Sequence, residues 1–169
     1  MLKDYESRFE YLIEPAKALT VAYQNAARYF DEVKEAVLIV HGLVHTSDLF
    51  HKTAHWFPAQ FDTVGDILHQ RHVIQRYGAT PEYSAPADDM GGIFAGAVSM
   101  LDEIETHLRD MIKVCDGGGD PALGRQFENL QIALSAEHEK FLTAWKMYDE
   151  SDSATSYDNW IANMEGGDN

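Results

Sequence analysis

The sequence predicts an all-α fold, a four-helix bundle, from three observations. Apolar residues recur at helical spacing over four long stretches of the 169-residue chain. Glycine, proline and aspartate collect between those stretches, as they do in turns. No segment has the strict alternation of polar and apolar residues that marks a half-buried strand. Four long helices joined by short turns and one longer connection indicate a bundle.

An extra helical segment is expected ahead of the bundle. Residues 4–14 can form a short amphipathic helix that ends at Pro15, and the alanine-rich residues 16–29 have a helical pattern. Asp31 is a good N-cap for a new helix. The chain is therefore divided into an N-terminal helical segment at 1–30, the four-helix bundle at 31–150 and an acidic tail at 151–169.

The first two helices of the bundle are placed on either side of Pro58. The first is expected over residues 32–56, where valines recur at helical spacing. Proline is tolerated in the first turn of a helix and is rare further inside. The second helix is therefore expected to start at Pro58 and to end at Tyr77, with Gly78 as its C-terminal stop.

The last two helices are separated by the turn DGGGDP. The third is expected from about Ile93 to Cys115, and the fourth starts at Pro121 with Asp120 as its cap. The connection at 78–92 can reach up to ~50 Å, and a twenty-residue helix is ~30 Å long. A crossover connection and a plain up-down-up-down order are therefore both open.

The remaining segments and the charge limit the classes of function. The tail carries Trp160 and Ile161 in a polar, acidic context and is expected to be disordered or to dock weakly. A net charge of −15 argues against DNA binding, which depends on basic side chains at phosphates. No apolar run approaches the ~18 residues of a membrane helix, and no secretory signal is evident. We expect a cytoplasmic protein in which Cys115 is a small buried residue.

Histidines concentrate in one part of the chain. Six of the eight lie between positions 41 and 72. His51 and His55 stand four residues apart, which puts both side chains on one helix face, close enough to share a metal. If the chain folds back at Pro58, these histidines lie level with Asp62 and Asp66. Two imidazoles and two carboxylates form a ligand set suited to Fe, Mn or Zn.

Alternatives to a metal site are open for several of these residues. Asp62 and Asp66 fall opposite an apolar stripe on their helix, as solvated residues do. His51 and His55 fit a buried polar role better, because they continue a core stripe. A second set of candidates lies in the third and fourth helices and fits either structural hydrogen bonds or a second metal site: Glu103, His107, Glu137 and His138.

Four patches of the sequence resemble the Dps branch of the ferritin-like superfamily, in the order in which that family has them. HKTAHWFPAQF resembles the end of its first helix, where a His-Trp pair occurs, and QRYGATPEY resembles the end of its second. HLRDMIKVCDGGGDPALGRQFENL resembles its third helix, turn and fourth helix, and LSAEHEKFLTAWKMY resembles the fourth helix itself. The resemblance covers roughly residues 35–148 and implies a ferritin-like fold.

The resemblance also implies a function. Dps proteins store iron in hollow oligomers, oxidise Fe(II) with peroxide or oxygen, and hold the metal between subunits. His55, next to Trp56, corresponds to the first histidine of the family site, with His51, Asp62 and Asp66 nearby. The chain departs from the pattern in a shorter second helix, in His72 where the family has glutamate, and in lacking a lysine-rich tail.

Three functional hypotheses follow. The first is a ferritin-like homo-oligomer that binds iron, and oxidises or stores it as a ferroxidase, with Mn or Zn as other metals for the site. The second is a non-catalytic helical oligomer or interaction protein that has lost the metal site. The third is a DinB-like metal-dependent hydrolase or transferase, which requires His41 or His45 to converge with His107 or His138.

Overall fold

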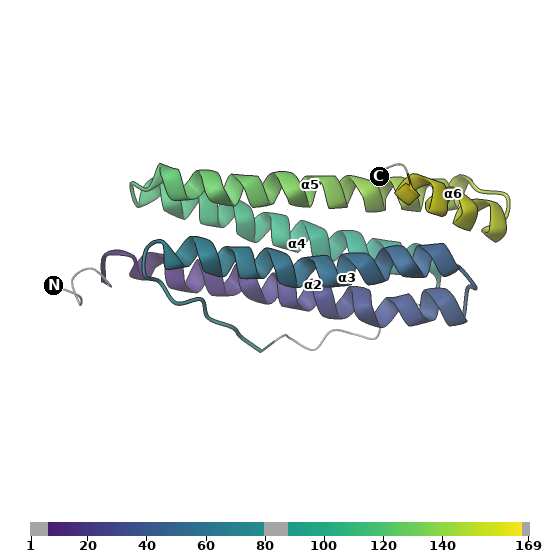
Figure 1. Cartoon of the computed structure of the whole chain (residues 1–169), viewed down its shortest axis with the longest axis horizontal. Coiled ribbons are helices and arrows are strands. Elements are labelled where there is room, and N and C mark those ends of the chain that lie inside the picture. The colour runs from purple at the N-terminus through teal and green to yellow at the C-terminus, as the bar shows by residue number, and fades with distance from the viewer. Residues whose placement is uncertain (1–6, 80–87, 167–169) are drawn as a thin grey trace.

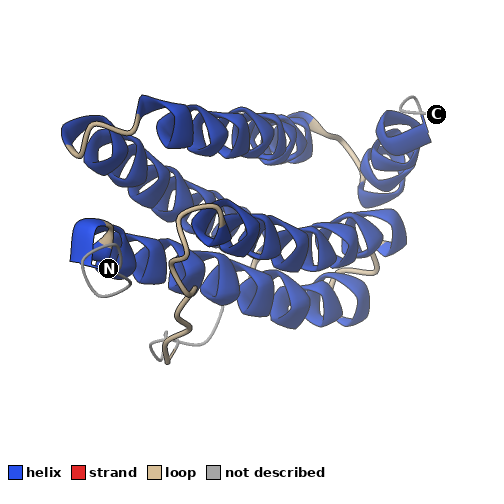
Figure 2. Ribbon diagram, turned by 60° about the vertical axis from the view of Figure 1, so that its left-hand side comes forward, coloured by secondary structure: helices blue, strands red, loops and turns tan. Residues whose placement is uncertain are grey.

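Helices make up most of the chain in a computed structural model, which describes residues 7–79 and 88–166 (Figure 1). Its elements are the 3-10 turn η1 (Glu10–Leu12) and the α-helices α2 (Ile13–Ile39), α3 (Val44–His69), α4 (Met90–Gly117), α5 (Pro121–Glu150) and α6 (Ala154–Gly166). These ranges contain no strand. Figure 2 shows the long helices packed side by side, with loops at the ends and along one side of the bundle. None of the described helices is both long and apolar enough to cross a membrane.

The first helix of the bundle is α2, and it corrects the predicted boundary at residues 30 and 31. Pro15 lies in the first turn of α2, where its missing N–H removes no helical hydrogen bond. Asp31 is an exposed residue in the middle of the helix and pairs with Lys34 one turn later. Residues 13–30 therefore belong to the same helix as residues 31–39.

The turn between the first two helices lies at residues 40–43, and the prediction of a turn at Pro58 is wrong. Gly42 adopts a φ of 67°, a left-handed conformation that glycine adopts without steric strain. Its N–H donates to the Leu38 carbonyl at 3.0 Å and closes the end of α2. Pro58 lies inside α3. The helix continues through it because Phe57 and its apolar neighbours are buried in the core.

The end of α3 also differs from the prediction. The helix ends at His69, not at Tyr77. His72 takes a φ of 55°, the left-handed position where glycine is usual, and the Val73 N–H donates to the Leu68 carbonyl at 3.1 Å. Residues 73–79 then run without helix along the bundle, tied down by the Gln75 amide, which donates to the Phe61 carbonyl at 2.7 Å.

Two contacts at opposite ends of the bundle establish a crossover. The guanidinium of Arg71, just after α3, donates to both carboxylate oxygens of Asp120, in the α4–α5 turn, at 2.6 and 3.0 Å. His41, in the α2–α3 turn, lies 2.7 Å from the carbonyl oxygen of Asp88, just before α4. Helices α3 and α4 therefore run parallel, and the described start of the connection, residues 73–79, lies along the bundle (Figure 1). Part of the predicted loop 78–92 lies outside the described residues.

The second pair of helices follows the prediction closely. Helix α4 starts at Met90, three residues before the predicted start, and Asp89 caps it by accepting from the Gly92 N–H at 2.9 Å. Helix α5 starts at Pro121, and Asp120 accepts from the Leu123 N–H at 3.2 Å, as predicted.

The acidic tail forms a helix that docks on the bundle, which corrects the expectation of disorder or weak docking. In α6 the side chains of Tyr157 and Ile161 are buried. The buried carboxylate of Asp158 accepts from the N–H of His45 at 3.0 Å, and from the N–H and hydroxyl of Thr46 at 2.8 and 2.9 Å. Asp158 thereby caps the start of α3, which has no cap from its own N-cap residue.

Aromatic rings fill the middle of the bundle. Phe30 of α2 lies with its ring centroid 5.0 Å from that of Phe57, 5.4 Å from that of Phe50 and 4.9 Å from that of Phe141. Phe94 of α4 joins the cluster through Phe50, at 5.8 Å. Each of the four long helices thus contributes to one aromatic core, and most of these pairs have the tilted or edge-to-face geometry that aromatic rings prefer.

Candidate metal centre

Among the described residues, few side chains that could bind a metal lie inside the bundle. Six polar or charged side chains are buried among the described residues: Thr20, Asn25, Thr46, Ser47, Thr53 and Asp158. Asp158 is the one carboxylate in this set, and it is engaged as the cap of α3. No histidine in the described ranges is fully buried. A metal inside the bundle would therefore meet aromatic rings and hydroxyls instead of carboxylates and imidazoles.

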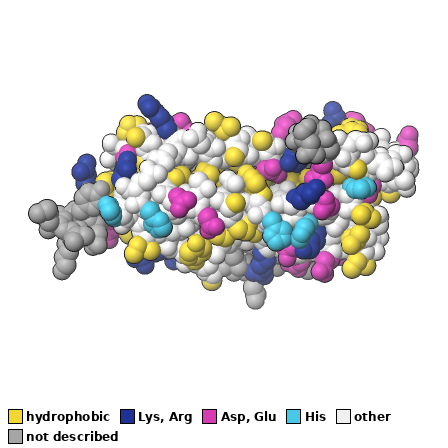
Figure 3. Space-filling view, viewed as in Figure 1, with side chains coloured by type: hydrophobic (Ala, Val, Ile, Leu, Met, Phe, Trp, Pro, Cys, Tyr) yellow, Lys and Arg dark blue, Asp and Glu magenta, His cyan; other side chains and the backbone are white. Residues whose placement is uncertain are grey.

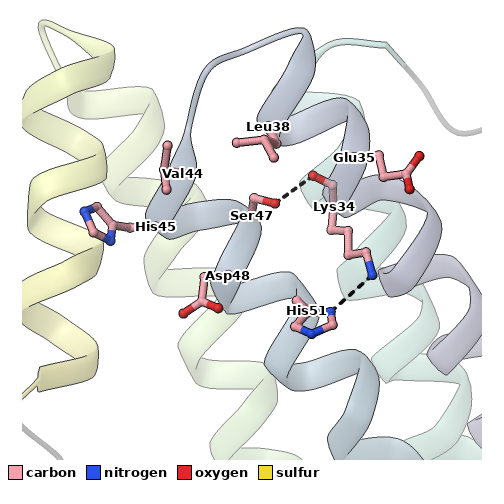
Figure 4. Close-up of a pocket in the computed structure, with 8 residues that line it drawn as sticks. All are labelled: Lys34, Glu35, Leu38, Val44, His45, Ser47, Asp48 and His51. Carbon is pink, nitrogen blue, oxygen red and sulfur yellow. Dashed lines mark hydrogen bonds between the residues drawn. The ribbon is translucent and has the colours of Figure 1, made fainter.

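The predicted histidine pair lies together on the outside of α3. The ring centroids of His51 and His55 are 4.5 Å apart, with the rings nearly perpendicular. His55 is exposed and His51 is half-buried. Nζ of Lys34, on α2, lies 3.1 Å from Nδ1 of His51, and Figure 4 shows this side chain reaching across from one helix to the other. The i, i+4 spacing has therefore brought two imidazoles within reach of one ion.

The predicted carboxylates are on the same helix as the histidines, not opposite them. Because α3 continues through Pro58, Asp62 lies ~16 Å along the helix axis from His51. One chain cannot bring all four predicted ligands to one ion. At ~100° per residue, however, His51, His55, Asp62 and Asp66 fall within roughly 60° of the helix circumference. Figure 3 shows histidine and acidic side chains in a row on this face.

The part of the chain that the structure describes contains no group of three or more His, Cys, Asp or Glu residues able to hold a metal ion. Within one chain, the histidine pair is therefore an incomplete site. Two imidazoles leave at least two coordination positions of a tetrahedral or octahedral ion open.

A carboxylate and an ammonium of α2 lie beside the histidine pair. Asp31 accepts a hydrogen bond from Lys34 within α2, and this bond is the main reason that the pKa of Asp31 is lowered. Partial burial opposes the shift, while the charges of Lys34, His51 and His55 reinforce it. The side chain of Lys34 is only 24% exposed, so its ammonium is held between the two helices.

The second set of candidates makes structural contacts. Nε2 of His138 on α5 lies 2.8 Å from Oδ1 of Asp102 on α4, a hydrogen bond that joins the two helices. Glu137 accepts from the hydroxyl of Thr53 at 3.3 Å and from Nζ of Lys140 at 3.1 Å. These contacts agree with the structural alternative, in which the histidine has a carboxylate partner.

The DinB-like arrangement is absent from the described residues. His41 and His45 lie in and just after the α2–α3 turn, at one end of α2. His107 and Glu103 line a groove of about 300 Å³ whose other residues, from Glu14 to Asn25, come from the opposite half of α2. His138 is engaged with Asp102. No open site with three convergent histidines forms in these ranges.

Solved structures share this arrangement of helices. A ferritin, the PmFTN variant soaked in iron, is 12% identical, with a TM-score of 0.74 over 88% of this chain and 97% of its own. The bacterioferritin BfrA of Mycobacterium tuberculosis is 9% identical, with a TM-score of 0.74 over 89% of this chain and 92% of its own. The fold is ferritin-like. No family model matches the sequence, and no curated protein matches it.

Di-metal proteins of ferritin-like fold show which residues a metal centre inside such a bundle needs. In di-metal members of this fold, two helices each contribute an inward glutamate and the other two each contribute a Glu-x-x-His motif. The present sequence contains no Glu-x-x-His motif. The interior positions of its four helices hold the aromatic cluster around Phe30. The interior residues that the structure describes therefore do not fit a metal centre inside the bundle.

Sequence reasoning missed Lys34 and Asp31 as neighbours of the histidine pair. The sequence gives little indication of this contact, because the approach of Lys34 to His51 depends on how α2 pairs with α3. That pairing follows from the turn at Gly42. With the turn placed at Pro58, the segment containing Lys34 belonged to the same helix as His51. The histidine pair itself was found because its spacing is local.

Proposed function

We propose that this chain is an iron-binding protein of ferritin-like fold whose metal site forms between two copies of the chain. The observation that carries the proposal is the outer face of α3, where half-buried His51 and exposed His55, Asp62 and Asp66 share one stripe. One chain separates the histidines from the aspartates, so a second chain has to bring them together. Iron is the cargo and, if oxidised, the substrate.

The order of the four residues supports a two-fold arrangement. His51 and Asp66 are equally far from the point between Pro58 and Ala59, and so are His55 and Asp62. Two α3 helices packed antiparallel about an axis through that point would pair each histidine with an aspartate of the other chain. Such an interface is self-complementary, as two-fold interfaces must be. It would contain two equivalent sites, each with two imidazoles and two carboxylates.

Exposed apolar residues near the histidines and near the aspartates support the arrangement. Near the histidines, Leu38 and Val44 are 44% and 58% exposed and line a groove of about 600 Å³. After the end of α3, Ile74 and Tyr77 are 77% and 54% exposed. Residues 73–79 run back along α3, where the Gln75 amide donates to the Phe61 carbonyl, so Ile74 and Tyr77 lie level with the half of α3 that carries the aspartates. The antiparallel pairing would bring them towards the histidine half of the other chain. Exposed apolar patches of this kind mark association surfaces.

The ligand chemistry suits Fe(II) and Fe(III). Carboxylate oxygens are hard donors for iron, and imidazole nitrogens are borderline ligands shared with Zn and Mn sites. The net charge of −15 favours cations near the surface and argues against DNA as a partner. Solved structures of similar fold include a ferritin and a bacterioferritin. The likeness to Dps proteins, whose site lies between subunits, rests on the sequence patches alone.

The test is anaerobic titration of the purified protein with Fe(II), followed by exposure to oxygen or peroxide, with the mass in solution measured in parallel. We expect about one iron per histidine pair in a dimer or larger oligomer. His55→Ala and Asp66→Ala should each weaken binding at least about tenfold. Asp110→Ala, at an exposed position on α4, is the matched control and should bind as the wild type does.

A second candidate is favoured by the aromatic interior and by the incomplete site in one chain. It is a helical oligomer that has kept the ferritin-like fold without a metal. In that case the protein associates through the same face, takes up no Fe(II), and leaves the rate of Fe(II) oxidation as it is in buffer. His55→Ala would then change neither mass nor metal content.

A further inference from the structure

The ammonium of Lys34 contacts a ring nitrogen of His51, one member of the histidine pair. Its Nζ lies 3.1 Å from Nδ1 of His51, and it is also hydrogen-bonded to Asp31. Figure 4 shows the ammonium at the end of a side chain that extends along α2 and turns towards His51 on α3. The contact lies beside His55, whose ring is 4.5 Å from that of His51.

The contact with Lys34 determines which ring nitrogen of His51 carries the proton. An ammonium group has only donors, so Nδ1 of His51 must accept the hydrogen bond with its lone pair. A neutral imidazole has one accepting nitrogen, and the proton is therefore on Nε2. In this state His51 has no free lone pair on either nitrogen.

A metal ion at His51 excludes the Lys34 contact by either route. If the ion binds Nδ1, it takes the lone pair that the ammonium uses. If it binds Nε2, the proton moves to Nδ1, and two donors then face each other. Metal-bound histidines usually donate their second N–H to an acceptor, which an ammonium cannot be.

We infer that Lys34 competes with the metal for His51, and that metal binding has to displace its ammonium from the histidine. This inference rests on the proposed function and assigns Lys34 a role in setting the affinity of that site. Asp31 makes the displacement feasible, because it already pairs with Lys34 from the same helix and keeps a partner for the ammonium after His51 is taken. Repulsion between the Lys34 ammonium and a divalent ion also favours displacement of the ammonium from His51.

The test compares Lys34→Met with the wild type by anaerobic calorimetric titration with Fe(II). Methionine keeps an unbranched side chain and removes the ammonium. We expect Fe(II) to bind about tenfold more tightly, the ratio expected when one charge-assisted hydrogen bond no longer has to be broken. Lys52→Met is the matched control, because Lys52 neighbours His51 in the sequence but pairs with Asp48 and Glu165. It should change the affinity much less.

A second readout does not depend on the metal. In the metal-free wild type, long-range proton–nitrogen NMR spectra should show His51 protonated on Nε2, and Lys34→Met should shift that population towards Nδ1. Unchanged or weaker Fe(II) binding by Lys34→Met, with binding still lost in His55→Ala, contradicts the role of Lys34 and leaves the proposed function standing. If no variant and no wild type binds Fe(II), the proposed function and this inference fail together.

Discussion

The interior of the bundle and the outer face of α3 hold opposite kinds of side chain. Inside, rings from all four long helices pack around Phe30, with centroid distances of 4.9–5.4 Å to its nearest partners Phe50, Phe57 and Phe141. Outside, His51 and His55 lie in contact on an accessible surface. Ferritin-like di-metal proteins place their ligands inside. In this chain the imidazoles and carboxylates proposed as ligands lie on the outer face of α3.

This comparison shows that the fold and the candidate site depend on different side chains. A four-helix bundle needs apolar side chains between its helices, and aromatic rings satisfy that need because they bury a large apolar area. A metal site needs only a few groups at the right spacing, and an exposed helix face can carry them. Function is decided by such sites and not by the fold that presents them. The following experiments test each side of this comparison, from the largest expected effect to the smallest.

The interior should control stability. Phe30→Ala removes the central ring of the aromatic cluster and leaves a cavity, so it should lower the free energy of unfolding by about 3–5 kcal/mol. Chemical denaturation followed by circular dichroism measures this change. Leu142→Ala, at a 37% exposed position on α5, is the control and should cost far less. A loss below about 1 kcal/mol at Phe30 would contradict a tightly packed interior.

The outer face should control association. Ile74→Asp puts a charge beside the aspartate half of the proposed interface and should raise the dissociation constant of self-association about ten- to a hundredfold. Sedimentation equilibrium measures the effect. Ile132→Asp introduces the same change at a 70% exposed position on α5 and should leave association as it is. Equal effects from both variants would move the interface away from α3.

The tail should stabilise the start of α3. Asp158→Ala leaves the N–H groups of His45 and Thr46 without their carboxylate, and should lower the free energy of unfolding by about 2 kcal/mol. Thermal unfolding measures the loss. Asp152→Ala, exposed just before α6, is the control and should change the midpoint little. A variant as stable as the wild type would mean that α6 contributes nothing to the start of the helix.

Acid should weaken the contact that fixes the end of α3. The hydrogen bond from Arg71 is the main cause that lowers the pKa of Asp120, so this carboxylate contributes stability above its unfolded pKa of ~3.9. That contribution is lost as pH falls below about 4 towards the lower folded pKa. Arg71→Gln should remove up to about 1 kcal/mol at pH 7 and less at pH 3. A difference between the two proteins that does not depend on pH would contradict the assignment.

The sequence predicted the second helix pair better than the first, for physical reasons. The caps and the turn around Asp120 are local signals, and α5 begins at Pro121 as predicted. For the first pair, the sequence predicted the turn at Pro58, whereas the structure places it around Gly42. An interior proline costs about 3 kcal/mol, but the burial of Phe57 and its neighbours outweighs that cost, which only the folded core reveals.

The candidate site was predictable only in part. The pair of His51 and His55 follows from spacing along one helix. The position of Asp62 and Asp66 depended on the misplaced turn, so their predicted approach to the histidines within one chain is wrong. The cap from Asp158 joins residues more than a hundred positions apart, and no local pattern indicates it.

The central claim is that the site combines histidines of one chain with aspartates of another, and mixing two inactive variants tests it most directly. One variant carries His51→Ala and His55→Ala, and the other carries Asp62→Ala and Asp66→Ala. Neither alone can form a complete site. A mixed dimer has one complete site of its two, so refolding the variants together should restore about a quarter of the wild-type Fe(II) capacity. No restored binding in mixtures shown by mass to contain both chains, with the wild type binding normally, would contradict a site shared between two chains.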